Sequence, residues 1–433
     1  MIPPSTRRIF LQQSLALGAS LPAFRWNPKP AHPLRASGRD KLNLGIIGVA
    51  GRGADNLGEV AAENIVALCD IDRNRLAGAR AGFPGAAAYE DYRELLQRND
   101  LDAVVVSTPD HTHAIPVVTA LRKGLHVYCE KPLAHSVHEA RTIREIASRK
   151  KLVTQMGTQI HAGDNYRRVV ELVKSGAVGR IARVHVWQGS AFPNSGVRVK
   201  DAKAPPHVNY DLWLGPAPER PFHESHFHFQ WRYWWDFGGG VLADFGCHYM
   251  DLPHWALDLT QPTRIEARGL KEYQGDNDVP SSMRVDYQYP ARGEQPPVHL
   301  TWYHGHWISD FNGFKAGVLF EGEGGMILAD YGSHRLFVSD ERGAVARPAA
   351  TIAPSIGHHR EWLEAIRSKG ETTCNFEYAG NLTECVHLGN AAYRSDTILE
   401  WSASDGRMTN TRAADPFLRR EYRSGWTLQE SDT

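Results

Sequence analysis

Short apolar runs separated by longer mixed segments dominate the first third of the chain. The runs occupy residues 42–47, 65–69, 103–106 and 125–129, and the intervening residues 54–62 and 115–123 are predicted to be helical. Apolar runs of this length are typical of buried strands in a parallel sheet. The alternation of strand and helix predicts a doubly wound α/β domain over residues 40–158.

The pattern changes after residue 159. A helical stripe of apolar residues covers 165–175, and alternation of apolar and polar residues predicts strands over 181–187, 263–268, 283–289 and 298–302. A hairpin is predicted over 318–328, and helices are predicted over 241–251, 358–366 and 381–395. These segments predict a second α/β domain over 159–433 with an antiparallel sheet. We expect the charged tail after Asp405 to cross onto a partner subunit.

Residues 1–36 have the composition of an export signal followed by a linker. Arg7 and Arg8 precede an uncharged, mainly apolar stretch over residues 15–24. This order is typical of a secretory signal, and the paired arginines resemble a twin-arginine signal, a route that carries folded proteins. The stretch is too short to span a bilayer permanently. We therefore expect a periplasmic or otherwise extracytoplasmic protein without stable membrane insertion.

Composition narrows the classes of function. The chain has 49 Lys and Arg residues against 49 Asp and Glu residues, so it has no net charge with which to bind nucleic acid. A hydrophobic content of 42% is typical of a globular protein rather than a disordered one. The five cysteines include no Cys-x-x-Cys pair and predict no disulfide framework, although pairing of Cys374 with Cys385 stays open.

A glycine-rich turn follows the first predicted strand. The segment Gly48-Val-Ala-Gly-Arg-Gly53 leads into a helix, and the next strand ends at Asp70. This order is the dinucleotide fingerprint, in which the helix N-terminus faces the pyrophosphate and the acid binds the ribose. Ala50 replaces the middle glycine, so either its methyl group is tolerated or the turn shifts by one residue. Asp70 favours NAD over NADP, although Arg73 is near enough in sequence to meet a 2′-phosphate.

Two further motifs end strands of the same domain. They are Ser107-Thr-Pro-Asp-His-Thr-His113 and Glu130-Lys131-Pro132. Together they resemble the Gfo/Idh/MocA family, which includes glucose–fructose oxidoreductase and inositol dehydrogenase, over most of residues 41–260. The resemblance implies a Rossmann domain, a second domain with a large open, mainly antiparallel sheet, and nicotinamide-dependent redox chemistry on sugars or polyols. It also implies that Lys131 lies beside the nicotinamide, that Glu130 lies near the cofactor ribose, and that Pro132 often follows a cis bond.

An acid and a histidine four residues apart follow the glycines at 238–240. Asp244 and His248 share one face of a predicted helix, where a surface ion pair is the usual role of such residues. The resemblance instead makes them the catalytic partners of Lys131. Physical chemistry agrees, because an ammonium group stabilises a developing alkoxide and a neutral imidazole accepts a hydroxyl proton.

The segment from Phe222 to Phe237 is unusually aromatic. Eight of its sixteen residues are aromatic and three are histidine. Aromatic faces suit the C–H faces of a sugar, but plain packing also accounts for the segment. A metal site at His223, His226 and His228 would need a carboxylate or cysteine at a suitable spacing, and none is present, so we expect no metal.

The candidate site therefore contains three groups of residues. The catalytic group is Lys131, Asp244 and His248. The cofactor-binding group is Gly48, Ala50, Gly51, Arg52, Gly53, Asp70, Ser107, Thr108, Pro109, His113, Glu130, Lys131 and Gln159. The substrate group is Arg167, Trp231, Trp235, Asp244, His248 and Tyr303.

These features predict an exported oxidoreductase that transfers hydride between a tightly bound NAD and a hydroxyl or carbonyl group of a sugar or polyol. An NAD-dependent glycosidase whose cycle is redox-neutral is the alternative, and a carbohydrate-binding scaffold without activity is a third hypothesis. The expected ligand is a sugar, polyol or glycoside rather than nucleic acid. A homodimer or homotetramer is expected, because the open sheet face invites packing between subunits.

Overall fold

The computed structural model describes residues 41–189, 196–198, 200, 202–308, 310–338 and 348–428. The predicted export signal lies outside these residues. Among the helices of the described part, none is both long and apolar enough to cross a membrane.

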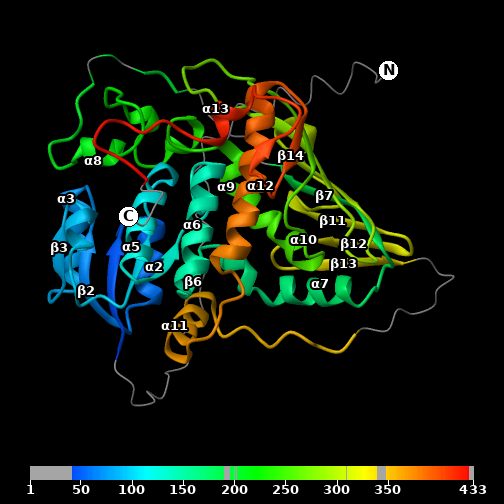
Figure 1. Cartoon of the computed structure of the whole chain (residues 1–433), viewed down its shortest axis with the longest axis horizontal. Coiled ribbons are helices and arrows are strands. Elements are labelled where there is room, and N and C mark those ends of the chain that lie inside the picture. The colour runs from blue at the N-terminus through cyan, green and yellow to red at the C-terminus, as the bar shows by residue number, and fades with distance from the viewer. Residues whose placement is uncertain are drawn as a thin grey trace. The chain divides into compact units, whose positions relative to one another are not determined.

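The first domain is a six-stranded parallel sheet with helices on both faces (Figure 1). Its strand order is β3-β2-β1-β4-β5-β6, so β1 lies between β2 and β4. This is the order of the dinucleotide-binding fold, whose ligands bind where the order reverses, between the carboxyl ends of β1 and β4. The strands are β1 (Asn43–Ile47), β2 (Asn64–Cys69), β3 (Ala87–Tyr89), β4 (Ala103–Val106), β5 (His126–Cys129) and β6 (Thr154–Met156). The helices are α2 (Arg52–Glu59), α3 (Arg73–Gly82), α4 (Tyr92–Leu95), α5 (Ala114–Arg122) and α6 (Val137–Lys150).

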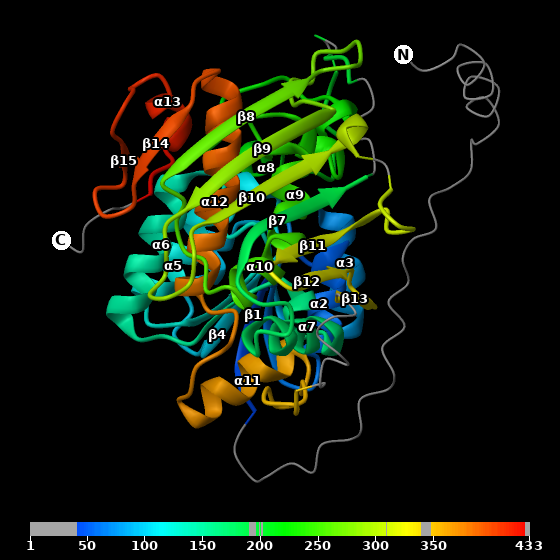
Figure 2. The same cartoon turned by 90° about the vertical axis from the view of Figure 1, so that its right-hand side faces the viewer.

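The second domain contains a nine-stranded sheet in the order β13-β12-β11-β7-β10-β9-β8-β14-β15 (Figure 2). Neighbouring strands are antiparallel except β7 and β10, which run parallel. The strands are β7 (Ile181–Gln188), β8 (Arg264–Leu270), β9 (Ser282–Tyr289), β10 (Val298–His304), β11 (Ala316–Gly322), β12 (Gly325–Ala329), β13 (His334–Val338), β14 (Leu399–Ser402) and β15 (Arg407–Met408). The mainly antiparallel sheet is therefore confirmed, while β13, β14 and β15 were not predicted because each is short or lies at the sheet edge.

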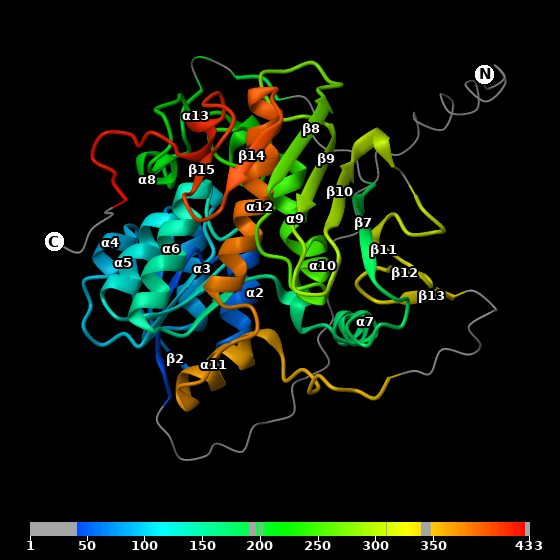
Figure 3. The same cartoon turned by 45° about the vertical axis from the view of Figure 1, so that its right-hand side comes forward.

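Two helices fill the space between the sheets (Figure 3). Helix α12 (Phe376–Ser395) contacts α6 of the first domain and β8 of the second, and α9 (Gly240–Tyr249) contacts α12, β7 and β10. The predicted helix over 241–251 divides at Met250, after which α10 (Asp251–Ala256) begins. The remaining helices are α7 (Asp164–Lys174), α8 (Tyr210–Leu214), α11 (His358–Ser368) and α13 (Asp415–Leu418).

Two late segments of the chain complete the first domain. Trp362 and Ile366 of α11 pack in one cluster with Leu44 and Ile46 of β1. The tail also packs on its own chain rather than leaving it, since the Tyr422 hydroxyl donates to Glu139 of α6 at 2.8 Å. The expectation that this tail also reaches a partner subunit stays a prediction.

All five cysteines lie within the described residues, and all are buried and free. The open question about Cys374 and Cys385 is thus settled, because each sulfur sits in the packed interior without a bond to the other.

Candidate active site

The glycine turn after β1 brings the backbone of β1 and β4 close together. Gly48 has a φ of +85°, and a Cβ atom there would lie 2.7 Å from the carbonyl oxygen of Ser107. A Cβ atom on Gly53 would collide with the carbonyl of Gly48. Gly51 caps α2 with a φ of 56°, whereas Ala50 is not among the residues with positive φ. The turn therefore takes its left-handed residue at Gly51, one position later than expected, and tolerates the methyl group of Ala50.

The free N-terminus of α2 fits a dinucleotide. Apart from the neighbouring residues in the chain, no atom of the described residues lies within 4 Å of a Cβ built on Gly51, so this side of the turn is open. Arg52, the first residue of α2, is exposed and pairs with Asp55 at 3.1 Å. An open helix N-terminus with an adjacent arginine is suited to hold a pyrophosphate.

Asp70 lies at the end of β2 beside this turn. One carboxylate oxygen accepts from the Val49 N–H and the other from the Asp72 N–H, both at 3.0 Å. Burial raises the pKa of Asp70, and these two hydrogen bonds oppose the rise. Arg73 is turned away, since its guanidinium group donates to the Pro206 carbonyl and pairs with Glu90 at 3.3 Å.

Glu130 is the centre of a buried polar network. Its Oε1 atom accepts from the side-chain amides of Asn56 at 2.9 Å and Gln159 at 2.7 Å. Asn56 also donates to the Ser107 hydroxyl, and His359 of α11 contacts the Asn56 carbonyl oxygen at 2.9 Å. The network thus joins three predicted cofactor residues, which are Ser107, Glu130 and Gln159. Asn56 and His359 were not predicted, although a polar residue on the buried face of α2 is a signal that points to Asn56.

The loop after β4 contains one open group and one internal brace. The Thr108 hydroxyl is buried and has no partner among the described residues, so it is available to a cofactor. His113, in contrast, contacts the carbonyls of Pro132 and Thr108 with its two ring nitrogens, at 2.8 and 2.7 Å. Burial lowers the pKa of His113 to about 4. Because both ring nitrogens face backbone carbonyls, His113 braces the loop. A direct contact of His113 with the cofactor stays a prediction. Pro109 caps the short helix that begins at Asp110.

Lys131 and Asp244 form the central ion pair of the site. The Lys131 Nζ atom lies 2.6 Å from Asp244 Oδ1 and also donates to the Asp244 carbonyl oxygen. The side chains are 12% and 16% exposed, so this pair is screened little by water. The peptide bond between Lys131 and Pro132 is cis. The structure therefore pairs Lys131 of the first domain with Asp244 of the second, two residues of the predicted catalytic group.

His248 lies one turn after Asp244 on α9. Its Nδ1 atom is buried and has no hydrogen-bond partner within the described part of the chain. Burial, and next the charge of Lys131, hold the pKa of His248 well below its usual range, so the ring is neutral. Asp244 pairs with cations instead of with His248, which excludes the simple helix ion pair.

Arg232 is a second cation at Asp244, and the sequence did not single it out. Its Nε atom lies 3.3 Å from Asp244 Oδ1, and its guanidinium group lies 4.2 Å from the centre of the Trp231 ring. A Cβ atom on Gly238 would lie 2.7 Å from the Arg232 Cα atom, so this glycine permits the close approach. Burial tends to raise the pKa of Asp244, but Lys131 and Arg232 outweigh it and keep the carboxyl group ionised.

Two further side chains near the ion pair, Asp110 and Tyr331, were not predicted as site residues from the sequence. Asp110 is 5% exposed, and burial raises its pKa to about 8 despite the nearby charges of Arg232 and Lys131. Tyr331 lies between β12 and β13, with its ring 6.1 Å from that of His248 in an edge-on arrangement. The sequence gave no signal for Tyr331, because only the folding of the second sheet brings this turn to α9.

The other predicted substrate residues all have contacts within the chain. Tyr303 follows Trp302 on β10 and packs with Trp187 on the sheet face opposite the main core, where its hydroxyl contacts His185. Arg167 contacts the Ala353 carbonyl at 2.8 Å. The backbone and the ring N–H of Trp235 bond to Asp278. Trp231 is buried and supports Arg232. The substrate roles of these four residues stay predictions.

The aromatic segment is mainly a packing cluster. Trp231, Trp234 and Phe237 of this segment form one buried cluster with the earlier residues Trp213, Leu214 and Ala217. His226 is fully buried and contacts the Tyr210 hydroxyl at 2.9 Å, and His228 contacts Asp72 at 3.3 Å. Among the described residues, no three His, Cys, Asp or Glu side chains are grouped as a metal site would require.

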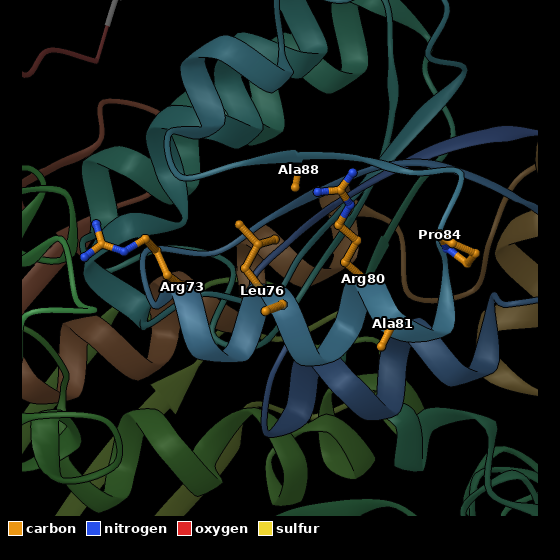
Figure 4. A pocket seen from close by; sticks show the side chains of 7 residues that line it. Arg73, Leu76, Arg80, Ala81, Pro84 and Ala88 are labelled. Atoms are coloured by element: carbon orange, nitrogen blue, oxygen red, sulfur yellow. The ribbon is translucent and has the colours of Figure 1, made fainter.

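A shallow surface hollow of about 460 Å³ lies elsewhere on the first domain (Figure 4). It is lined by α3 and by Pro84 and Ala88, with Arg73 and Arg80 among its side chains. None of its lining residues belongs to the catalytic group, so it is a feature of the domain surface.

Comparison with known proteins identifies the family. Residues 42–158 match the oxidoreductase family, NAD-binding Rossmann fold, and residues 163–428 match the C-terminal alpha/beta domain of the same family. The chain belongs to the Gfo/Idh/MocA oxidoreductase family. This finding confirms the predicted fold class and the prediction that the first domain binds NAD.

Individual relatives are similar over part of their length. Inositol 2-dehydrogenase of Rubrobacter xylanophilus is 35% identical over 164 residues, which are 36% of this chain and 47% of that protein. An uncharacterized oxidoreductase of Rhizobium meliloti is 30% identical over 183 residues, which are 41% of this chain and 54% of that protein. The chain spans about half the length of the curated relatives it matches.

Solved structures share the fold over most of the chain. The WlbA dehydrogenase from Bordetella pertussis, in complex with NADH and UDP-GlcNAcA, has a TM-score of 0.61 and 17% identity, and covers 84% of this chain and 99% of that one. Levoglucosan dehydrogenase in complex with NADH and L-sorbose has a TM-score of 0.59 and 19% identity, over 84% of this chain and 99% of that one.

Proposed function

We propose that this Gfo/Idh/MocA member is an NAD-dependent dehydrogenase that acts on a secondary hydroxyl group of a sugar or polyol. The observation that carries the proposal is the meeting of Lys131 with Asp244 and His248 beside an NAD-binding domain. Inositol 2-dehydrogenases among the relatives support the substrate class, as does the levoglucosan dehydrogenase among the structural neighbours.

Each polar group has a distinct task in this proposal. Bound NAD supplies the hydride acceptor. Lys131 presents its ammonium group to the substrate oxygen and stabilises the negative charge that develops as the carbinol C–H bond breaks. Neutral His248 accepts the hydroxyl proton at a free ring nitrogen, and its buried, unpartnered Nδ1 atom supports this role. Asp244 orients Lys131, and Arg232 in turn keeps Asp244 ionised.

The groups around Asp70 favour NAD over NADP. The Asp70 carboxylate is fixed by two backbone N–H groups, which leaves its remaining lone pairs for a ribose diol. The negative charge of this carboxylate would repel a 2′-phosphate. Arg73, the nearby cation, is already bonded to Pro206 and Glu90. We therefore propose that phosphorylation of the ribose weakens binding.

Export by the twin-arginine route is part of the proposal and rests on Arg7, Arg8 and the apolar stretch after them. An exported enzyme meets little free NAD, so it needs a bound cofactor that is regenerated in place. Regeneration would use a second carbonyl substrate or an electron-accepting partner.

A substrate panel with the purified protein tests the proposal. Sugars and polyols are added to the NAD-loaded enzyme, and absorbance near 340 nm is followed together with mass analysis of products. Substrate-dependent NADH formation is expected. Release of an aglycone from a glycoside without net NADH would instead show the redox-neutral glycosidase.

A variant of the central lysine tests the catalytic assignment. Lys131→Met should lower kcat by about 10²–10⁴-fold, because a positioned charge and proton-transfer group is lost. NADH binding, measured by fluorescence, should persist. The matched control is Lys150→Met on the exposed end of α6. Unchanged turnover in Lys131→Met would exclude the proposed role.

A further inference from the structure

A segment of the second domain is bonded directly to the loop that carries the ribose-binding acid. We call residues 205–228 the clasp. Val208 forms an antiparallel bridge with Asp72, the Arg73 N–H donates to the His207 carbonyl at 2.9 Å, and the Asn209 N–H donates to the Ile71 carbonyl at 2.9 Å. The loop after β2 is therefore joined to the other domain by an isolated β-bridge.

Side chains strengthen the same junction. His228 Nε2 lies 3.3 Å from Asp72 Oδ2, and the other carboxylate oxygen of Asp72 accepts from the first N–H groups of α3. The Arg73 guanidinium group donates to the Pro206 carbonyl. Ile71 packs against the aromatic cluster that contains Trp213. Asp72 thus links the start of α3 to the clasp.

The clasp also reaches the loop after β4. His111 in that loop contacts the Trp213 carbonyl oxygen at 2.8 Å, and a Cβ atom on Gly215 would lie 2.9 Å from the Thr112 methyl group. The tail fixes the clasp from outside, because Arg423 donates to the carbonyls of Gly215 at 3.0 Å and Asp211 at 2.8 Å. The two loops that flank the dinucleotide site are consequently joined by one element.

We infer that the clasp is a cofactor-retaining element, which holds the loops after β2 and β4 closed and slows the release of NAD. The inference rests on the proposed NAD site at Asp70. The loop after β2 begins with Asp70, the proposed ribose partner, and the loop after β4 lies where the strand order reverses, which is the place at which a dinucleotide binds in this fold. In this inference, NAD leaves when the two loops separate. Separation would break the backbone bonds of Arg73 and Asn209 and the Asp72–His228 contact. Such retention suits an enzyme that must carry its cofactor.

Release kinetics test the clasp. The purified full chain is loaded with NADH, excess NAD⁺ is added, and the loss of NADH fluorescence gives the release rate. The double variant Arg73→Ala/His228→Ala should release NADH about tenfold faster or more, because affinity changes in one site appear mainly as dissociation rates. Arg80→Ala is the matched control, since Arg80 is an exposed arginine in the last turn of the same helix α3, away from Asp72.

Hydrogen exchange provides a readout that does not depend on activity. The amides of Arg73 and Asn209 should exchange faster in His228→Gln than in the unmodified protein, and bound NADH should protect both together. His228→Gln also serves as the test if the double variant does not fold. Release rates and exchange equal to those of the unmodified protein would overturn the clasp.

The outcomes separate the clasp from the proposed activity. Slow NADH release that the variants accelerate, without turnover of any sugar or polyol, supports the clasp and overturns the dehydrogenase. Turnover of a sugar or polyol, together with NADH release rates that the variants do not change, supports the dehydrogenase and overturns the clasp. Failure of the unmodified protein to bind NADH would overturn both.

Discussion

Charge placement around one carboxylate decides what the site can do. Asp244 meets Lys131 at 2.6 Å and Arg232 at 3.3 Å, while Asp110 is buried near the same two cations. Lys131, Asp244 and His248 were predictable because each belongs to a local motif with a fixed spacing. Arg232 was not, because its position depends on a close approach of backbone at Gly238 rather than on any periodic pattern.

Removal of Arg232 should move the pH dependence of catalysis. Arg232→Met takes away one of the two cations that lower the pKa of Asp244, so that pKa should rise and the acid limb of kcat should shift to higher pH. The pH profile of kcat checks this. Arg232→Lys keeps a positive charge beside Asp244, so its profile should stay close to that of the unmodified protein. Arg220→Met, which removes a guanidinium group bonded to Asp236 instead, is the control. An unmoved acid limb would contradict the role of Arg232.

Asp110 should make stability fall as pH rises. Its pKa is about 8 in the folded protein and near 3.8 ordinarily, so the folded state holds a proton that the unfolded state loses. Its stabilising contribution is fully present below about pH 4 and is lost between there and pH 8, at up to about 1.4 kcal/mol per pH unit. Denaturant unfolding of Asp110→Asn should show a smaller fall from pH 5 to pH 8.

Asp100→Asn is the control for that measurement, because Arg98 lowers the pKa of the exposed Asp100 and its titration lies below this range. Parallel stability curves for Asp110→Asn and the unmodified protein would show that Asp110 is not protonated in the folded state.

At the scale of elements, α12 is the piece on which both domains pack. It begins at Phe376, five residues before the predicted start, because Asn375 caps it through the N–H groups of Glu377 and Tyr378. An Asn residue at this position predicts the start of a helix from the sequence. The packing of the helix against both domains cannot be predicted in this way. Its Gly389 faces β9, where a side chain would meet the Tyr287 hydroxyl.

Two glycine substitutions should have opposite effects on stability. Gly389→Ala should destabilise the protein by about 1–3 kcal/mol, because the methyl group would overlap Tyr287 and Leu242. Gly78→Ala on α3 meets no atom within 4 Å and should be neutral or stabilising by about 0.5–1 kcal/mol. The urea unfolding midpoints of the two variants and the unmodified protein measure these changes in stability. Equal effects would show that the α12–β9 contact is looser than described.

At the scale of the whole molecule, the two domains are interwoven along the chain. Helix α11 completes the core beside β1, and the tail binds both α6 and the clasp. Because late segments close the dinucleotide-binding domain, that domain is complete only when the entire chain has folded. Export after folding is compatible with such an arrangement, since the chain would not need to pass unfolded through a membrane.

The proposed export signal can be tested on the intact protein. The double variant Arg7→Lys/Arg8→Lys removes the arginine pair but keeps its positive charge. We expect this variant to stay in the cytoplasm. Cell fractionation followed by detection of the protein measures this. Arg35→Lys in the linker is the control and should be exported normally. Export of the double variant would show that the pair is not read as a signal.

The sequence by itself determined the strands and helices of the first domain, the glycine turn and the Lys131 and Asp244-x-x-x-His248 motifs, because these depend on neighbours along the chain. Tertiary structure alone decided that Tyr303 faces away from the main core, that the aromatic segment is packed, and that Arg232 meets Asp244. Those outcomes depend on which surfaces of distant segments meet, and alternation or spacing within one segment contains no information on that.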